Sequence, residues 1–276
     1  MTLKEIYSFS IEELLFTECA EFESQCLIED ILGYSKEQIY LNNIILDESE
    51  IEKIKNAIIR RKNNEPLQYI LGKWDFYDLT FSVGEGVLIP RPETEALVDF
   101  ALEKLKNIEK PIVYDLCSGS GCIGLTIAKH RKDATVYLLE KETNALQYLL
   151  KNKVDNQIEN VVVIHDDLFT VDLSKFLDAD LILSNPPYIN SDEIAQLQKE
   201  VLFEPVSALD GGNDGLAFYR CLAERWCDKI KKGGYMALEC GEEQSKSIIE
   251  LFNGKYIENN VIFDFNNIDR IVTFRI

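Results

Sequence analysis

From residue 112 onward, short apolar runs alternate with segments of helical character, and this alternation limits the fold more than any other feature. Five of the runs are predicted strands, at 112–116, 135–140, 161–165, 180–184 and 235–240. Helix-like segments lie between them, at 122–130, 142–151 and 213–232. Such alternation is typical of a parallel, doubly wound α/β sheet. Two last strand-like runs, 261–265 and 270–276, are separated only by 266–269, so we expect an antiparallel hairpin at the sheet edge.

The first 65 residues have a different texture and predict a small helical bundle. Leu3, Ile6 and Tyr7 share one helical face, and Ile51, Ile54 and Ile58 recur at helical spacing after Asp47. The runs Ser10–Glu13 and Ser35–Gln38 match the capping box that begins a helix. The aromatic and β-branched run 74–83, followed by Gly84 and Gly86, predicts a hairpin. We therefore divide the chain into a helical domain (1–72), a β-hairpin linker (73–90) and a larger α/β domain (91–276).

Composition excludes several classes of protein. With 29 basic and 48 acidic residues, the net charge is −19, which disfavours a protein that binds a phosphate backbone. We expect no direct nucleic-acid binding. An odd number of cysteines, seven, with two histidines and no Cys-x-x-Cys fits neither a disulfide framework nor a metal site. Because no apolar run is long enough to span a membrane and the N-terminus does not resemble a signal peptide, we expect a cytoplasmic protein without membrane contact.

A glycine-rich loop follows the first predicted strand of the α/β domain and opens a helix. Gly119, Gly121 and Gly124 match the pattern G-x-G-x-x-G, and Glu140 ends the next strand, where a carboxylate can accept both hydroxyls of a ribose. Asp115 stands beside the loop, where an anion would repel a pyrophosphate but attract the ammonium group of a methionine. S-adenosylmethionine is therefore the favoured ligand. An NAD-type cofactor and a glycine turn without a ligand remain the alternatives.

The tetrapeptide Asn185-Pro186-Pro187-Tyr188 follows the fourth strand and is the most informative segment of the chain. A planar amide or exocyclic amine is a poor nucleophile, so its N–H groups must be held with the nitrogen facing the methyl donor. The Asn185 side-chain carbonyl and the following backbone carbonyl, of Pro186, can each accept one N–H. Two prolines keep the backbone rigid, and Tyr188 offers a flat face for stacking. We assign Asn185, Pro186 and Tyr188 to catalysis, and all four residues to the acceptor site.

Taken together, the motifs resemble the HemK/PrmC glutamine methyltransferases, which methylate the glutamine of the Gly-Gly-Gln loop of class 1 peptide chain release factors. The resemblance covers nearly the whole chain. The matching segments are 65–72, 74–77, 88–95, 115–121, 185–188, 203–205 and 210–216.

This resemblance implies a fold, a reaction and a set of site residues. The fold is a Rossmann-like, seven-stranded class I S-adenosylmethionine-dependent methyltransferase domain, joined by a hairpin linker to a helical domain that helps to hold the release factor. The product of the cofactor is S-adenosylhomocysteine. We expect a monomer. The acceptor glutamine is held by 185–188, and the adenine is bordered by 166–169, where Leu168 replaces an aromatic residue found in some relatives. The residues assigned to the cofactor are Asp115, Cys117, Ser118, Gly119, Ser120, Gly121, Glu140, Asp167, Leu168 and Asn185.

Other readings use the same residues for different functions. The motif Pro90–Glu95 fits the first turn of a helix whose buried face carries Leu97, Ala101 and Leu105, so Arg91, Glu93 and Glu95 receive no catalytic role. The acceptor could instead be a glutamine of a ribosomal protein or the exocyclic amine of adenine in a nucleic acid. A reductase that binds NAD at the glycine loop and a non-catalytic binding module complete the alternatives.

Overall fold

The computed structural model describes residues 1–40, 44–264 and 266–276, and its contacts divide them into two units. The smaller unit comprises Met1–Lys73 and Gln198–Phe203, and the larger comprises Trp74–Leu197 and Glu204–Ile276. The predicted hairpin therefore belongs mainly to the larger unit, and a short segment from the middle of the chain joins the smaller one. No helix among these described residues is both long and apolar enough to cross a membrane.

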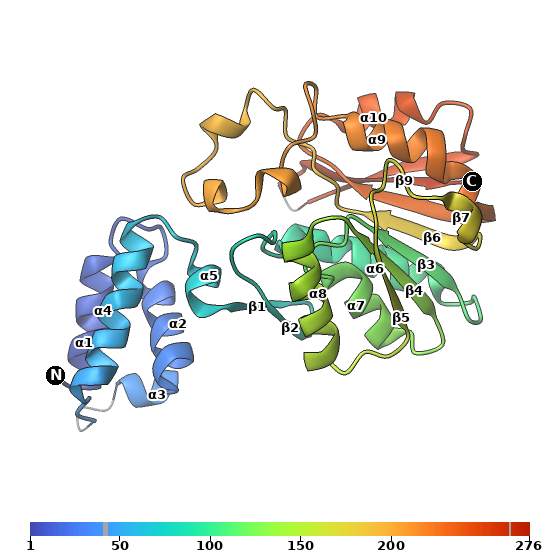
Figure 1. Ribbon diagram of the computed structural model, residues 1–276. Helices are drawn as coiled ribbons and strands as arrows, with labels where there is room; N and C mark the ends of the chain where they lie inside the picture. The colour runs from blue at the N-terminus through green and yellow to red at the C-terminus, as the bar shows by residue number, and fades with distance from the viewer. Residues whose placement is uncertain (41–43, 265) are drawn as a thin grey trace. The chain divides into compact units, whose positions relative to one another are not determined.

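The smaller unit is a bundle of helices, as predicted (Figure 1). Leu3, Ile6 and Tyr7 are buried, and so are Ile54 and Ile58. The capping box at Ser35–Gln38 is confirmed. The described helices are α1 (Leu3–Glu13), α2 (Ala20–Leu32), α3 (Lys36–Ile39), α4 (Glu48–Lys62) and α5 (Leu67–Leu71).

The predicted capping box at Ser10–Glu13 is wrong. Ser10 lies inside α1, where its buried hydroxyl donates a hydrogen bond to the Ile6 carbonyl oxygen at 2.8 Å. The helix begins eight residues earlier, at a capping box formed by Thr2 and Glu5. A serine hydroxyl can cap a helix or bond back to the preceding turn, and the buried face of α1 selects the second arrangement.

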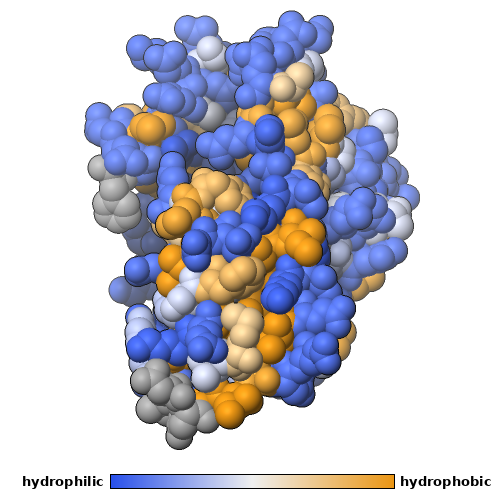
Figure 2. All heavy atoms as spheres, turned by 90° about the vertical axis from the view of Figure 1, so that its left-hand side faces the viewer, coloured by the Kyte–Doolittle hydropathy of each residue, from blue (hydrophilic) through white to orange (hydrophobic). Residues whose placement is uncertain are grey.

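Large apolar side chains also remain exposed on the smaller unit. Figure 2 shows apolar residues lying between hydrophilic ones on the face that it presents. Among the described residues of this unit, the exposed large apolar side chains include Leu15, Phe16, Phe22, Tyr40, Ile45 and Ile59.

A seven-stranded sheet forms the centre of the larger unit, in the order β5-β4-β3-β6-β7-β9-β8. The strands β3 to β7 are parallel, and β9 is antiparallel to both of its neighbours, so the predicted terminal hairpin is confirmed. Phe265, at the predicted end of its first strand, lies outside the described residues. The strand bounds are β3 (Ile112–Leu116), β4 (Thr135–Glu140), β5 (Val161–His165), β6 (Ala179–Ser184), β7 (Ile230–Glu239), β8 (Glu258–Phe263) and β9 (Asp269–Arg275).

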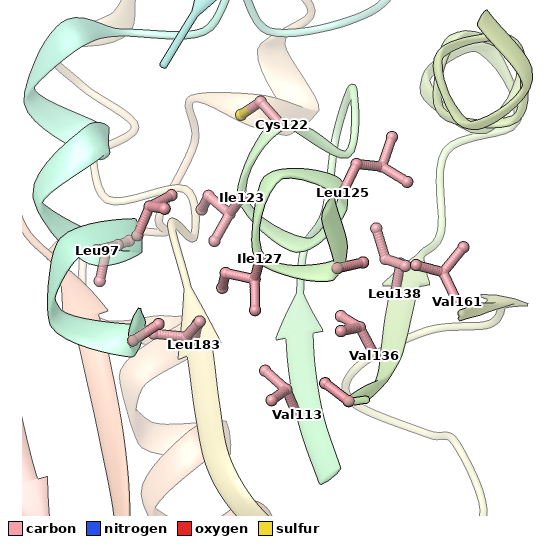
Figure 3. Close-up of a cluster of buried hydrophobic side chains, with 14 of the residues drawn as sticks. Leu97, Val113, Cys122, Ile123, Leu125, Ile127, Val136, Leu138, Val161 and Leu183 are labelled. Atoms are coloured by element: carbon pink, nitrogen blue, oxygen red, sulfur yellow. The ribbon is translucent and has the colours of Figure 1, made fainter. Parts of the chain in front are cut away.

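Helices cover both faces of this sheet. On one face α6 (Glu95–Leu105), α7 (Cys122–His130) and α8 (Thr143–Asp155) pack on alternate residues of the strands, among them Val113, Val136 and Leu183 (Figure 3). On the other face α9 (Ala217–Cys221) and α10 (Ser245–Leu251) cover residues of the opposite parity, such as Tyr114. Because both faces are buried, the inner strands are apolar throughout, which is why their bounds could be predicted from the sequence.

Two further predictions concern segments that flank the sheet. The hairpin is confirmed as β1 (Lys73–Phe76) and β2 (Leu79–Ser82). The helix predicted at 213–232 is shorter, because α9 begins at Ala217 and continues as a π-helical turn and a 3-10 turn only to Lys229. Residues 230–232 belong to β7 instead, since Gly233, with φ of 83°, lets that strand run through the expected break.

Candidate functional site

A cavity of about 450 Å³ opens at the carboxyl ends of β3, β4 and β6 in the larger unit. Parallel sheets commonly bind ligands there, where strand order reverses. The cavity brings together three segments that were predicted as site residues: the glycine loop after β3, Glu140 at the end of β4 and Asn185 after β6.

The glycine loop is shaped by its backbone. Gly119 and Gly121 have φ of 54° and 83°, and even Cys117 takes a positive φ of 62°. A Cβ atom at Gly121 would approach Leu125 to 2.9 Å, whereas one at Gly119 would meet no atom within 4 Å. Since Gly119 lines the cavity, its missing side chain leaves room for a ligand against the backbone. The loop is tied to β4 because the Ser118 amide donates to the Leu139 carbonyl oxygen at 3.1 Å.

Glu140 connects this loop with the end of β4. One carboxylate oxygen accepts the Gly119 amide at 2.7 Å, and the other accepts the Glu142 amide at 2.7 Å. Burial raises the pKa of Glu140, and these backbone hydrogen bonds act in the opposite direction. The side chain lines the cavity while it is held on both oxygens. Such a fixed acceptor suits a pair of ribose hydroxyls.

Asp115 does not line the cavity, although it was predicted to meet a cofactor. It is fully buried beneath the loop, where one oxygen accepts the Gly124 amide at 2.9 Å. Its other oxygen, Oδ1, has no hydrogen-bond partner among the described residues. Burial raises the pKa of Asp115 to about 7. The site therefore holds an unsatisfied carboxylate directly under the loop, and a bound cation would lower its cost.

The segment after β5 forms an apolar and aromatic wall. Asp167 accepts the Phe169 amide at 2.8 Å, which turns the chain toward the cavity. Leu168 is almost fully buried and also contacts the core under α9. Phe169 is 41 % exposed and packs edge-on against Phe218, with 5.0 Å between the ring centroids. Both rings line the cavity, so the aromatic surface that is missing at Leu168 is present at two neighbouring positions.

Asn185 is held by a single side-chain hydrogen bond. Its Nδ2 donates to the Thr94 hydroxyl at 3.2 Å. No described residue donates a hydrogen bond to Asn185 Oδ1 or to the carbonyl oxygen of Pro186. The two acceptor atoms named by the sequence therefore both lack a donor among the described residues. Asn185 and Pro187 line the cavity, whereas Pro186 and Tyr188 are absent from its lining.

The backbone at Tyr188 is clamped by neighbouring loops. The Gln244 side chain donates to the Tyr188 carbonyl oxygen at 2.9 Å. A Cβ atom at Gly215 would approach the same oxygen to 2.4 Å, and one at Gly211 would approach the Tyr188 Cα to 2.8 Å. Both glycines belong to the segment 210–216, whose role the sequence left open. Their lack of a side chain lets the loop pack directly on the end of the tetrapeptide 185–188.

Sequence reasoning assigned no role to several residues that line the cavity. The lining also includes Gly86, Val87, Leu88, Pro90, Arg91, Thr94, Pro205, Val206, Ser207, Ala208, Asp210 and Phe218. Arg91 pairs with Glu204, which is buried and also accepts the Ile89 amide at 2.9 Å. Glu204 is thus joined to the segment 88–95 beside the cavity. The helix reading of Pro90–Glu95 is also confirmed, because Pro92 opens the turn before α6 and Leu97, Ala101 and Leu105 are buried.

Comparisons with known proteins agree with this geometry. The family described as PrmC N-terminal domain matches residues 13–72, and the Methyltransferase small domain matches residues 94–213. The release factor glutamine methyltransferase of Thermodesulfovibrio yellowstonii is 40% identical over 255 residues, which cover 91% of this chain and 90% of that protein. The protein of the same name from Fusobacterium nucleatum is 35% identical, with 91% of this chain and 72% of its own length covered.

A solved structure shows the same fold without close sequence similarity. The hMettl16 catalytic domain in complex with MAT2A 3'UTR hairpin 6 has a TM-score of 0.57 at 11% identity, over 84% of this chain and 83% of that one. The architecture is that of class I S-adenosylmethionine-dependent methyltransferases. Sequence identity over nearly the full length identifies the family more narrowly, and the chain belongs to the release factor glutamine methyltransferases.

Proposed function

We propose that this protein transfers a methyl group from S-adenosylmethionine to the side-chain amide nitrogen of the glutamine in the Gly-Gly-Gln motif of a class 1 peptide chain release factor. The observation that carries the proposal is the environment of Asn185. Its amide is fixed through Nδ2, its Oδ1 is unoccupied by any described donor, and it shares a cavity with the glycine loop and Glu140. Membership of the family supports both the reaction and the acceptor.

The residues that would hold the cofactor surround the glycine loop. Residues Cys117–Ser120 would provide a backbone surface, Glu140 would face the ribose, and Asp167 with Leu168 would border the adenine, beside the rings of Phe169 and Phe218. Gly121, which was predicted with this group, does not line the cavity. Asp115 contributes its negative charge from below the loop rather than by lining the cavity. When bound, S-adenosylmethionine supplies a methyl group on a positively charged sulfur. The residues present fit this ligand. Glu140 offers acceptors for the ribose hydroxyls, Asp115 offers a negative charge for the cation, and the segment after β5 offers an apolar wall for the adenine.

The acceptor tetrapeptide would act by positioning. Asn185 Oδ1 and the Pro186 carbonyl oxygen each accept one N–H of the glutamine amide, which fixes the plane of that amide. Pro186 and Pro187 are buried and have no N–H to compete for these oxygens. Orientation of this kind can supply a large part of a rate enhancement. No general base is needed, since an amide nitrogen becomes strongly acidic as it is alkylated.

The remaining parts of the proposal concern the partner. The helical domain (1–72) would help to hold the release factor, and its exposed apolar side chains suit contact with a protein. The net charge of −19 favours a protein substrate over a nucleic acid. We further propose that the protein acts as a monomer in the cytoplasm, where release factors work.

Mass spectrometry of the substrate tests the proposal. The purified protein is incubated with S-adenosylmethionine and an unmethylated class 1 release factor, and the Gly-Gly-Gln peptide is then analysed. We expect a gain of one methyl group on the glutamine, and none on a release factor in which that glutamine is replaced by glutamate. Cofactor binding by calorimetry without any gain in mass would overturn the assigned substrate, and ribosomal proteins and duplex DNA would be tested next.

A further inference from the structure

Glu239 is a buried carboxyl group beside the acceptor site for which neither the family comparison nor the reaction gives a role. It ends β7, the strand next to β6, and the pairing of Ser184 with Leu238 puts Asn185 and Glu239 at the same level. Glu239 is 3% exposed, and its Oε2 has no hydrogen-bond partner among the described residues. A charged side chain buried in this way is costly to the fold unless it serves a purpose.

Thr94 lies between Glu239 and Asn185. Its side chain is 1% exposed, and it lies close enough to the Glu239 carboxyl group to lower the pKa of that group. The same hydroxyl oxygen accepts Asn185 Nδ2 at 3.2 Å. Glu239 of β7, Thr94 of the 3-10 turn before α6 and Asn185 of the loop after β6 therefore lie in a row that ends at the acceptor site.

The chemistry of these groups determines which of them donates and which accepts each hydrogen bond. The structure gives the hydroxyl proton of Thr94 no acceptor among the described residues, and it gives Glu239 Oε2 no donor. Because a carboxylate can only accept a hydrogen bond, Glu239 is the neighbour that suits this proton. Thr94 Oγ1 is then left with lone pairs alone and can bind only a donor. The atom of Asn185 that faces Thr94 must therefore be Nδ2, and Oδ1 must be turned away from it.

We propose that Glu239 and Thr94 are positioning residues, which fix the amide of Asn185 so that its oxygen receives the acceptor amide of the substrate. This inference deepens the proposed function and rests on it for the identity of that substrate. The Glu239 carboxylate orients Thr94, and Thr94 orients Asn185. A flipped Asn185 would present N–H groups to an acceptor that itself offers N–H groups, and methyl transfer would be lost.

The relay formed by Glu239, Thr94 and Asn185 also depends on pH. Burial raises the pKa of Glu239 to about 7, opposed by the hydrogen bond of Thr94, while Glu93 raises it further and Arg270 and Arg91 lower it. Above this pKa the carboxylate accepts from Thr94. Below it the protonated acid can donate to Thr94, whose proton is then free to bond Asn185 Oδ1 and stabilise the flipped amide. The other titratable neighbours stay neutral near pH 7 because burial raises their pKa values, namely Tyr188, Tyr219, Cys122 and Cys240.

Two variants of Thr94 distinguish a role in positioning Asn185 from a role in the fold. Thr94→Val keeps the shape of the side chain and removes the hydroxyl, whereas Thr94→Ser keeps the hydroxyl. We expect Thr94→Val to lower kcat by about 10- to 100-fold, as loss of an orienting partner commonly does. Thr94→Ser should stay close to wild type, with KM for the release factor and Kd for the cofactor nearly unchanged in both. A kcat for Thr94→Val equal to that of Thr94→Ser would overturn the proposal.

Glu239→Gln tests whether the carboxylate of Glu239 sets the orientation of the Asn185 amide. A glutamine amide can either donate to Thr94 or accept from it, so the orientation of Asn185 is no longer enforced. We expect kcat of the wild type to fall as pH decreases from 8 to 6, and that of Glu239→Gln to be low and flat over this range. A wild-type profile that Glu239→Gln reproduces would contradict the relay.

A measurement without turnover distinguishes failure of this inference from failure of the proposed function. In protein labelled with nitrogen-15 on asparagine, the Asn185 side-chain amide is identified by its loss in Asn185→Asp. Its signal should titrate near pH 7 in the wild type and cease to do so in Glu239→Gln. A signal that does not titrate in the wild type overturns the relay even in an active enzyme. A titrating signal in a protein that methylates no release factor supports the relay and rejects the substrate.

Discussion

At the scale of single residues, the side chain of Asp115 is buried where its ionised form is unfavourable. Its raised pKa, about 7 against an ordinary value of 3.8, results from burial and is only partly offset by the Gly124 amide. Gly124 has no room for a side chain, since a Cβ atom there would lie 2.9 Å from Asp115 Oδ2. The close approach of α7 to β3 thus keeps water away from Asp115. A positive charge bound near Asp115 Oδ1, which has no hydrogen-bond partner among the described residues, would stabilise the ionised carboxylate.

The pKa of Asp115 predicts how stability changes with pH. A folded-state pKa above the unfolded one favours the folded state at low pH, and this advantage is lost as pH rises from about 4 to 7. Each such group contributes a slope of about 1.4 kcal/mol per pH unit. We therefore expect Asp115→Asn, without cofactor, to lose less stability between pH 5 and pH 7 than the wild type does, measured by urea unfolding.

An exposed carboxylate provides the control for this measurement. Asp133 pairs with Arg131, whose hydrogen bonds lower the pKa of Asp133 to about 2. It is ionised in both the folded and the unfolded protein at pH 5 and above, so Asp133→Asn should leave the slope unchanged. Equal slopes for the wild type and Asp115→Asn would show that Asp115 is ionised throughout this range.

The residues of the site could be predicted only where one short segment carries the chemistry. Asn185, Glu140 and the glycine loop were predicted because each follows a strand and the ends of parallel strands meet. Thr94 and Phe218 were missed because their place at the cavity depends on contacts with distant segments. Asp115 was predicted to lie near the site, but its burial below the loop was not predicted, since a sequence does not show how closely α7 approaches the sheet.

At the scale of elements, Asn152 ties three of them together. This buried residue of α8 accepts the Ser82 amide at 2.6 Å and donates to the carbonyl oxygens of Ser82 and Ser120 at 3.1 and 3.0 Å. Ser82 ends the hairpin, and Ser120 belongs to the glycine loop. The hairpin and the glycine loop are therefore both bound by one side chain.

Removal of this side chain should affect both stability and cofactor binding. Asn152→Ala leaves three backbone groups without partners, the buried carbonyl of Ser120 and the partly buried amide and carbonyl of Ser82, so we expect a loss of about 2 to 4 kcal/mol in the free energy of unfolding. Weaker cofactor binding should accompany it, because Ser120 lines the cavity. Asn156→Ala, one turn later, is the control. Asn156 is only half-buried, so water can replace its hydrogen bond to Thr80 and the loss should stay below about 1 kcal/mol. Equal losses for the two variants would contradict this role.

Elements differed in how well the sequence defined them. The strands β3, β4 and β5 and helix α7 have the predicted bounds, because short continuous apolar runs and a loop rich in glycine leave few alternatives. The start of a helix is less well defined by the sequence, as Ser10 shows, since the same residue type caps helices and bonds within them. The register of β7 through Gly233 could not be predicted from local sequence, because it depends on pairing with strands on both sides.

At the scale of the whole molecule, the smaller unit is completed by a segment far away in the sequence. Arg61 is 3% exposed and binds Glu23 at 2.7 Å and Glu200 at 2.7 Å. Glu200 lies in Gln198–Phe203, which follows the acceptor tetrapeptide along the chain. No local pattern marks this segment as part of a helical unit, so the sequence predicted a domain that ended at residue 72.

The Arg61 pairs predict a large effect on the smaller unit. Arg61→Ala leaves the buried Glu23 without its partner, which typically costs about 3 to 5 kcal/mol. We expect faster hydrogen exchange in α1, α2 and α4, measured by mass spectrometry. Arg60→Ala removes the neighbouring, more exposed pair with Glu65 and should change exchange little. Similar exchange in the two variants would show that the buried pairs do not stabilise the unit.

The central claim is that one cavity serves both substrates and that Asn185 acts only on the acceptor. The most direct test is to compare Asn185→Ala with the wild type in two assays, methylation of the release factor glutamine and calorimetric binding of S-adenosylmethionine. We predict that kcat falls by orders of magnitude while the Kd for the cofactor changes by no more than a few-fold. Full turnover in Asn185→Ala would contradict the claim.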